Sequence, residues 1–140
     1  METERIAQGL IDRSLPKAQW THHAHLRAGL WHVLHYPEAQ ALDLLRERIR
    51  AYNLATGVAN SQDAGYHETI TRFYVRLLCD FVAQAERTRP LDELAHEAIE
   101  RLGAKDLPLR YYSAARLFGR PARAGWVEPD LQPLPGAPSA

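Results

Sequence analysis

This sequence of 140 residues has one cysteine, no net charge and no long apolar segment. The single cysteine, Cys79, excludes an intrachain disulfide, and its place in the apolar run 75–82 predicts a small core residue. The formal net charge is +0 at pH 7, so the chain has no long-range attraction for nucleic acid or anionic lipid. We therefore expect neither a nucleic acid nor a membrane as its partner.

Targeting and cofactor signatures are missing as well. The N-terminal segment 1–14 carries charges throughout, which argues against a secretory signal, and no segment approaches the apolar length that spans a bilayer. The expected location is therefore the cytoplasm. The sequence also has no phosphate loop, dinucleotide fingerprint or nucleophile elbow. Any chemistry must come from another arrangement of side chains.

The apolar pattern is helical, and no segment alternates with the two-residue period of a strand. Proline, glycine and turn-forming residues divide the chain into six helical segments, at about 3–13, 17–36, 37–56, 66–86, 90–102 and 110–118. The four long segments are joined by short links. We predict an all-α fold, specifically an antiparallel four-helix bundle with an additional short C-terminal helix.

The C-terminal twenty residues are rich in proline, which can indicate a disordered tail. Trp126 and Val127 argue against this, because both would be costly to leave in water. We expect an extended, proline-rich strip that packs on the bundle as far as Leu134. The predicted organisation is a single domain over 1–134 with a flexible end over 135–140.

Histidine is the most informative residue type. Five of the seven histidines fall within segment 17–36, so helical spacing can sort them into faces: His22, His23, His25, His32 and His35. His22, His25 and His32 follow steps of three and seven residues and share one face. His22 and His25 are one turn apart and form the best pair. The other three are expected to be supporting or surface residues.

A second motif, Gly65-Tyr-His-Glu-Thr69, opens the later helical segment 66–86. On a helical projection His67 shares the inward face with Ile70 and Tyr74, and an inward histidine needs a polar partner. Alternate helices of an up-down bundle run in the same direction. Both histidine motifs lie near the N-terminal ends of such helices, so we expect them at the same end of the bundle.

These arguments predict a metal site with His22, His25 and His67 as ligands. Three imidazoles with an open fourth position suit catalytic zinc and could also hold copper or nickel, whereas two histidines with Glu68 would suit iron(II). In the first case Glu68 is free to act as a general base on bound water. The hydroxyl of Tyr52 could bond a ligand histidine or a substrate. The alternative is that all of these are ordinary core or surface residues.

Two resemblances extend this prediction. The motifs Thr21-His-His-Ala-His-Leu26 and Gly65-Tyr-His-Glu-Thr-Ile-Thr71 resemble those of a family of small uncharacterised bacterial helical proteins, for which no activity is implied. The plan of a helical bundle with inward histidines is similar to that of the DinB/YfiT-like metalloproteins. Those proteins place one histidine on an early helix and an HxxxH pair on a late one, whereas this chain has HxxH early and one histidine later.

The function expected from the sequence is that of a small metal-dependent enzyme acting on a small polar substrate. Its metal-bound water or oxygen species would perform the reaction, with zinc, iron, copper or nickel as the divalent transition metal. Two alternatives remain open at this point. One is a non-catalytic helical module that binds a partner or a second copy as a homodimer, and the other is a metal sensor or carrier.

Overall fold

The computed structural model describes residues 1–135, and within this range the chain is helical without a strand. The prediction of an all-α fold is therefore confirmed. The α-helices, in chain order, are α1 (Glu2–Ile11), α2 (His22–His35), α3 (Glu38–Ala55), α4 (Glu68–Gln84), α5 (Leu91–Leu102), α6 (Ala114–Leu117) and α7 (Arg120–Ala124). Two 3-10 turns, Lys17–Gln19 and Leu107–Arg110, complete the elements. Among the described residues, no helix has the length and apolarity that crossing a membrane requires.

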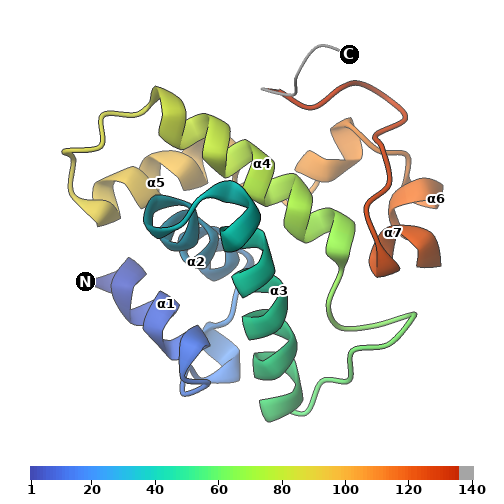
Figure 1. The fold of residues 1–140 in the computed structure, drawn as a ribbon, viewed down its shortest axis with the longest axis horizontal. Coiled ribbons are helices and arrows are strands. Elements are labelled where there is room, and N and C mark those ends of the chain that lie inside the picture. The colour runs from blue at the N-terminus through green and yellow to red at the C-terminus, as the bar shows by residue number, and fades with distance from the viewer. Residues whose placement is uncertain (136–140) are drawn as a thin grey trace.

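Helix α2 lies at the centre of the molecule and contacts α1, α3, α4 and α5. Its buried residues follow one another without a break from Ala28 to Val33, so this part of α2 is enclosed rather than amphipathic. Figure 1 shows α3 descending from the centre while α4 runs diagonally across the top, so the two helices cross steeply. The predicted antiparallel four-helix arrangement is not confirmed, because the other helices surround α2 in several directions.

Two helices begin later than the sequence pattern indicates. The segment predicted from residue 17 is a 3-10 turn followed by α2, which starts after Thr21, whose side chain accepts a hydrogen bond from Ala24 N. The segment predicted from residue 66 is helical only from Glu68, with His67 as the N-cap residue. Just before it, Gly65 has φ +81°, and a Cβ there would collide with the carbonyl of Ala59. This glycine therefore sets the direction in which the chain enters α4.

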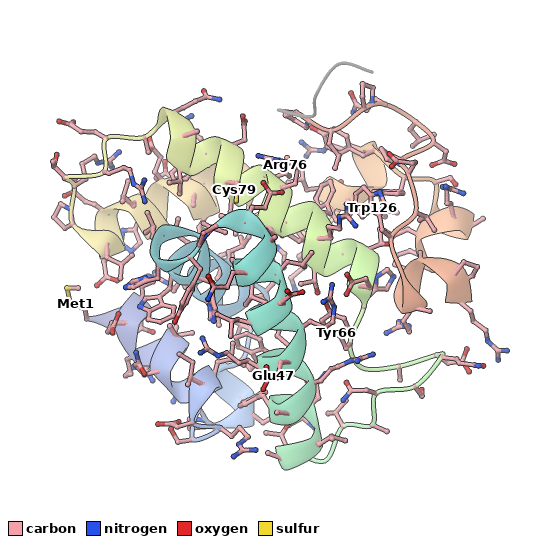
Figure 2. All side chains as sticks on the ribbon, in the orientation of Figure 1. Met1, Glu47, Tyr66, Arg76, Cys79 and Trp126 are labelled. Carbon is pink, nitrogen blue, oxygen red and sulfur yellow. The ribbon has the colours of Figure 1, made fainter. Side chains whose placement is uncertain are left out.

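The C-terminal strip packs on a hydrophobic cluster of its own. This cluster has six buried members: Phe73, Leu77, Leu107, Tyr112, Leu117 and Leu134. Tyr112 donates a hydrogen bond to the carbonyl of Val127 at 2.7 Å, and the Leu131 N–H donates to the carbonyl of Tyr111 at 2.9 Å. Figure 2 shows Trp126 beside α4 on this side of the molecule. The strip therefore packs as far as Leu134, as predicted, and the flexible end predicted at 135–140 lies, except for Pro135, outside the described residues.

Candidate functional site

An apolar cavity of about 370 Å³ lies between α2, α3 and α4. Its walls include Leu45 and Ile49 from α3 and Val75 and Leu78 from α4. On the side of α2 the wall includes Gly29, where a Cβ would lie 2.8 Å from a methyl carbon of Leu78, so a larger residue would require the Leu78 side chain to move. No aspartate, glutamate, lysine or arginine lines the cavity. Its size and apolar walls are those of a small-molecule pocket.

His25 lies at this cavity with its ring stacked on Trp20, the two centroids being 3.8 Å apart. Its Nδ1 is 2.6 Å from the carbonyl oxygen of Thr21. Because a carbonyl can only accept, Nδ1 carries the proton and Nε2 keeps a lone pair. The residue remains exposed overall, but desolvation by the apolar atoms around the ring lowers the pKa of His25 to about 4. The imidazole is therefore neutral at physiological pH.

His22 and Tyr74 also line the cavity, and their rings meet edge to face with centroids 5.8 Å apart. The Nε2 atom of His22 and the hydroxyl of Tyr74 are both buried and make no hydrogen bond of regular geometry among the described residues, although the backbone of Gly103 is near enough to the His22 ring to counteract part of the fall in its pKa. Burial lowers the pKa of His22 and raises that of Tyr74 to about 12, so both groups are uncharged near neutral pH. Both residues therefore contribute to the cavity wall, and the polar atom of each is uncharged, enclosed and without a partner among the described residues.

His67 does not share this cavity. As the N-cap residue of α4 it accepts a hydrogen bond at Nδ1 from Ile70 N (3.1 Å), and its Nε2 donates to the carbonyl of Leu117 (2.8 Å). These two bonds require the neutral tautomer with the proton on Nε2. Burial also lowers the pKa of His67, which favours the same neutral form. Both ring nitrogens are thus used in holding the fold together.

Glu68 and Tyr52, the predicted catalytic residues, likewise make structural contacts and do not line the cavity. Arg46 donates to both carboxylate oxygens of Glu68, at 2.8 and 2.6 Å, and the hydroxyl of Tyr66 donates at 2.8 Å. Burial alone would raise the pKa of Glu68, but these hydrogen bonds lower it below its ordinary value. The hydroxyl of Tyr52 donates to the carbonyl of Leu15 at 2.7 Å in the core.

The predicted metal ligands are therefore divided between two places. His22 and His25 line the cavity, whereas His67 is turned toward α6. Within residues 1–135 no group of three histidine, cysteine, aspartate or glutamate side chains is placed to hold a metal ion. The reason is local: His67 precedes the first helical residue, so the helical projection that aimed it inward with Tyr74 does not apply to it.

The remaining histidines have separate roles. His32 is fully buried, with Nδ1 donating to the carbonyl of Ala28 (2.7 Å) and Nε2 accepting from Arg48 (2.8 Å). His35 stacks on the buried ring of Trp31 and donates from Nδ1 to the carbonyl of that residue at 2.7 Å. The last two histidines, His23 and His96, are exposed.

Trp20 and Tyr74 are the site residues that the sequence analysis missed. Tyr74 lay on the expected inward face of its helix, but nothing in the pattern indicated that its hydroxyl would lack a partner. Trp20 precedes α2, and only its stacking with His25 brings it to the cavity.

Comparison of the chain with protein-family models, with curated proteins and with solved structures finds no match in any of the three. The two resemblances based on the histidine motifs remain predictions. Inferences about function therefore start from the cavity and from the side chains around it.

Proposed function

We propose that the chain binds a small, uncharged, largely apolar molecule that carries one hydroxyl or carbonyl group. The binding site is the cavity between α2, α3 and α4. The observation that carries this proposal is a mainly apolar cavity wall without charged residues, to which His22 and Tyr74 each contribute a buried polar atom without a partner. A buried polar group without a partner costs about 1–3 kcal/mol, so a ligand that hydrogen-bonds these two atoms would recover part of that cost.

The apolar wall supports the greater part of this ligand. Leu45, Ile49, Val75 and Leu78 offer hydrocarbon surface, and Trp20 with His25 offers a pair of stacked rings. Each square ångström of apolar ligand surface removed from water contributes about 25 cal/mol. A ring of six carbons fits a cavity of about 370 Å³, and flat aromatic ligands gain further contact by packing against the rings.

The lining favours an uncharged ligand. No aspartate, glutamate, lysine or arginine lines the cavity. The titratable groups that do line it are neutral near pH 7, because the pKa of His25 is lowered to about 4 and the pKa of Tyr74 is raised to about 12. A charged ligand would lose its hydration without gaining a counter-charge, which is a large penalty. A hydroxyl can accept from Tyr74 while donating to an imidazole nitrogen, and a carbonyl can accept from Tyr74.

Binding is better supported than acid–base catalysis. A general base works best with a pKa near the operating pH, and the pKa of His25, at about 4, is far below that. Glu68 is held by Arg46 and Tyr66 away from the cavity. His25 is therefore suited to accept a hydrogen bond through Nε2 and poorly suited to remove a proton.

The experiment is a ligand titration followed by NMR chemical shifts, with benzyl alcohol and benzaldehyde as uncharged probes and benzoate and benzylammonium as charged ones. We expect the uncharged probes to shift resonances of cavity residues and the charged probes to bind at least tenfold more weakly, the loss expected when one charge is left unpaired. In Tyr74→Phe the affinity for benzyl alcohol falls by about tenfold.

Tyr111→Phe is the matched control, because Tyr111 is half-buried, outside the cavity, and its hydroxyl makes no hydrogen bond among the described residues. It should bind benzyl alcohol as the wild type does. The proposal is abandoned if no uncharged probe binds, if Tyr74→Phe binds unchanged, or if benzoate binds as well as benzyl alcohol.

A second candidate retains the predicted metal ion, held by His22 and His25 without His67. One helical turn separates these neutral imidazoles, and the Nε2 atom of each lacks a partner among the described residues. Transition metals such as zinc bind neutral imidazole, and their remaining ligands would be water or substrate. Zinc titration distinguishes this candidate: binding lost in both His22→Ala and His25→Ala but kept in His67→Ala supports it, and zinc binding unaffected by the first two refutes it.

A further inference from the structure

A second recess, of about 310 Å³, lies between α3, the connection 56–67 and α7, and shares no lining residue with the apolar cavity. Its lining is polar and positively charged, whereas that of the cavity is mainly apolar and uncharged. Arg50 and Arg123 line it together with Ser61, Gln62 and the ring of Tyr66. Figure 2 shows Tyr66 between α3 and the start of α4, at the base of this connection.

Arg50 has its guanidinium 5.3 Å from the centre of the Tyr66 ring. Within residues 1–135 it donates no side-chain hydrogen bond and forms no ion pair, so all of its donors are available. Stacking on an aromatic ring holds a guanidinium in place without using its N–H groups, which point outward in the plane of the fork. Arg50 is therefore oriented and exposed, and its N–H groups are open to solvent or to a ligand.

Arg123 is anchored differently. One terminal nitrogen, Nη1, donates to the carbonyl of Gly65 at 2.8 Å and lies 3.4 Å from that of Tyr66. The other nitrogens have no acceptor within the described part of the chain. The backbone turn at Gly65 therefore fixes the position of Arg123 and leaves part of its donor fork unused.

No acidic residue in the lining balances these two charges. Two nearby carboxylates are engaged elsewhere: Asp63 pairs with Arg120 at 3.0 Å, and Glu68 pairs with Arg46 at 2.6 Å. Glu47, one turn before Arg50 on α3, forms no ion pair with it among the described residues and lies outside the lining. The recess thus has two guanidinium groups in its lining without a counter-charge. An anion bound in the recess would supply that counter-charge.

The connection that carries the remaining donors is held in place by Asn60. Its Oδ1 accepts from Tyr66 N and from the side chain of Asn53, both at 3.0 Å, and its Nδ2 donates to the carbonyl of Arg50 at 3.1 Å. Ser61 Oγ accepts from the backbone of the same turn, which leaves its O–H free to donate. The donors are therefore organised before any ligand arrives.

We infer that this recess binds the phosphoryl group of a small molecule. A phosphate monoester carries close to two negative charges at neutral pH, which matches the two arginines, whereas a carboxylate would neutralise only one. Its three terminal oxygens can accept from both forks and from Ser61. This inference is independent of the ligand proposed for the apolar cavity, because the two sites share no lining residue.

The test is a calorimetric or NMR titration with inorganic phosphate and phenyl phosphate at constant ionic strength, with acetate as the monoanionic comparison. We expect phosphate and phenyl phosphate to bind at millimolar concentration or below and to shift resonances of 56–67. Arg50→Gln should weaken binding by about tenfold, the value of one hydrogen-bonded charge. Because Arg50 makes no other side-chain hydrogen bond, this variant keeps the fold, which circular dichroism checks.

Arg72→Gln is the matched control, since Arg72 also stacks on an aromatic ring, that of Trp126 at 4.7 Å, but lies outside the recess. Its affinity for phosphate should equal that of the wild type. The inference is overturned if the wild type does not bind phosphate, if Arg50→Gln binds it unchanged, or if Arg72→Gln weakens it as much. Acetate binding as tightly as phosphate would overturn the assignment to a phosphoryl group.

Discussion

His67 and Leu117, fifty residues apart in the sequence, are joined by a 2.8 Å hydrogen bond from the imidazole Nε2 to the carbonyl oxygen. The other ring nitrogen accepts from Ile70 N at 3.1 Å. One neutral imidazole thus caps α4 and ties it to α6, a helix of four residues that is too short to be stable alone. The contact positions the C-terminal part of the molecule on the helical core.

Replacement of His67 should therefore lower stability rather than remove a metal. We expect His67→Ala to reduce the free energy of unfolding by about 2 kcal/mol, because it removes an N-cap and leaves the Leu117 carbonyl without its donor. His67→Asn restores the cap and should recover about half of this loss. Urea denaturation measures both variants. His96→Ala, at an exposed position, is the control and should change stability by less than about 0.5 kcal/mol.

Two tyrosines provide a matched pair of hydroxyl deletions. Tyr52→Phe should destabilise the chain by about 1–2 kcal/mol, since it leaves the buried carbonyl of Leu15 unpartnered. Tyr74→Phe should leave stability unchanged or raise it by up to about 1 kcal/mol, because the hydroxyl it removes is buried without a partner. Thermal or urea unfolding compares the two. Equal destabilisation by both substitutions would show that the Tyr74 hydroxyl has a partner in solution.

Stability should decrease on mild acidification, with His32 as one cause. Desolvation of this fully buried ring lowers its pKa to about 4 in the folded chain, whereas an unfolded histidine titrates near its ordinary value of 6.5. Between these values the unfolded chain binds more protons than the folded one. Stability is therefore fully present above pH 6.5 and falls as the pH decreases toward about 4. The lowered pKa values of His22, His25 and His67 act in the same direction.

The contribution of His32 can be isolated with His32→Gln, which preserves an acceptor for Arg48 but does not titrate in this range. Unfolding free energies measured in steps from pH 7 to pH 4 should fall less steeply for the variant than for the wild type. The largest difference a single group can make is about 1.4 kcal/mol per pH unit. Parallel profiles would contradict the assignment.

The Arg46–Glu68 pair should respond unequally to removal of its two members. The side chain of Glu68 is only 10% exposed and that of Arg46 is 34% exposed, so Arg46 can return to solvent but Glu68 cannot. We expect Glu68→Gln to lower stability by about 1 kcal/mol and Arg46→Gln by about twice as much, because the latter leaves a buried carboxylate without its counter-charge. Glu68→Gln should leave binding of benzyl alcohol unchanged. A loss of benzyl alcohol binding in Glu68→Gln would show that Glu68 contributes to ligand binding in the cavity.

Most of the secondary structure was predictable from the sequence. Helical periodicity, Pro37 and Pro90 before helices and Gly103 after one are local signals, so α3 and α5 lie within a residue or two of their expected bounds. The packed strip was predictable because Trp126 needs apolar neighbours. Helix α7 was not expected, since Pro121 in its first turn resembled the rest of the proline-rich segment.

The candidate site was predictable only in part. The sequence placed His22 and His25 on one face of a helix, and they do line one cavity. It placed His67 with them by assuming that the helix began two residues earlier than it does. At an N-cap the backbone is extended and the side chain turns back toward the first-turn N–H groups, so helical spacing no longer predicts its direction.

The sequence by itself determined the helical class, the main helix segments and the presence of neutral polar groups among apolar ones. These follow from local periodicity and from chemistry that each residue carries with it. Only the tertiary structure decided which hydrogen bonds those groups make. Leu117 accepts a hydrogen bond from His67 and Arg46 donates to Glu68 across long stretches of chain, whereas no described residue forms a hydrogen bond with the Tyr74 hydroxyl. Which residues form a hydrogen bond depends on the distances between different elements in space, and the spacing of residues along one helix gives no information about those distances.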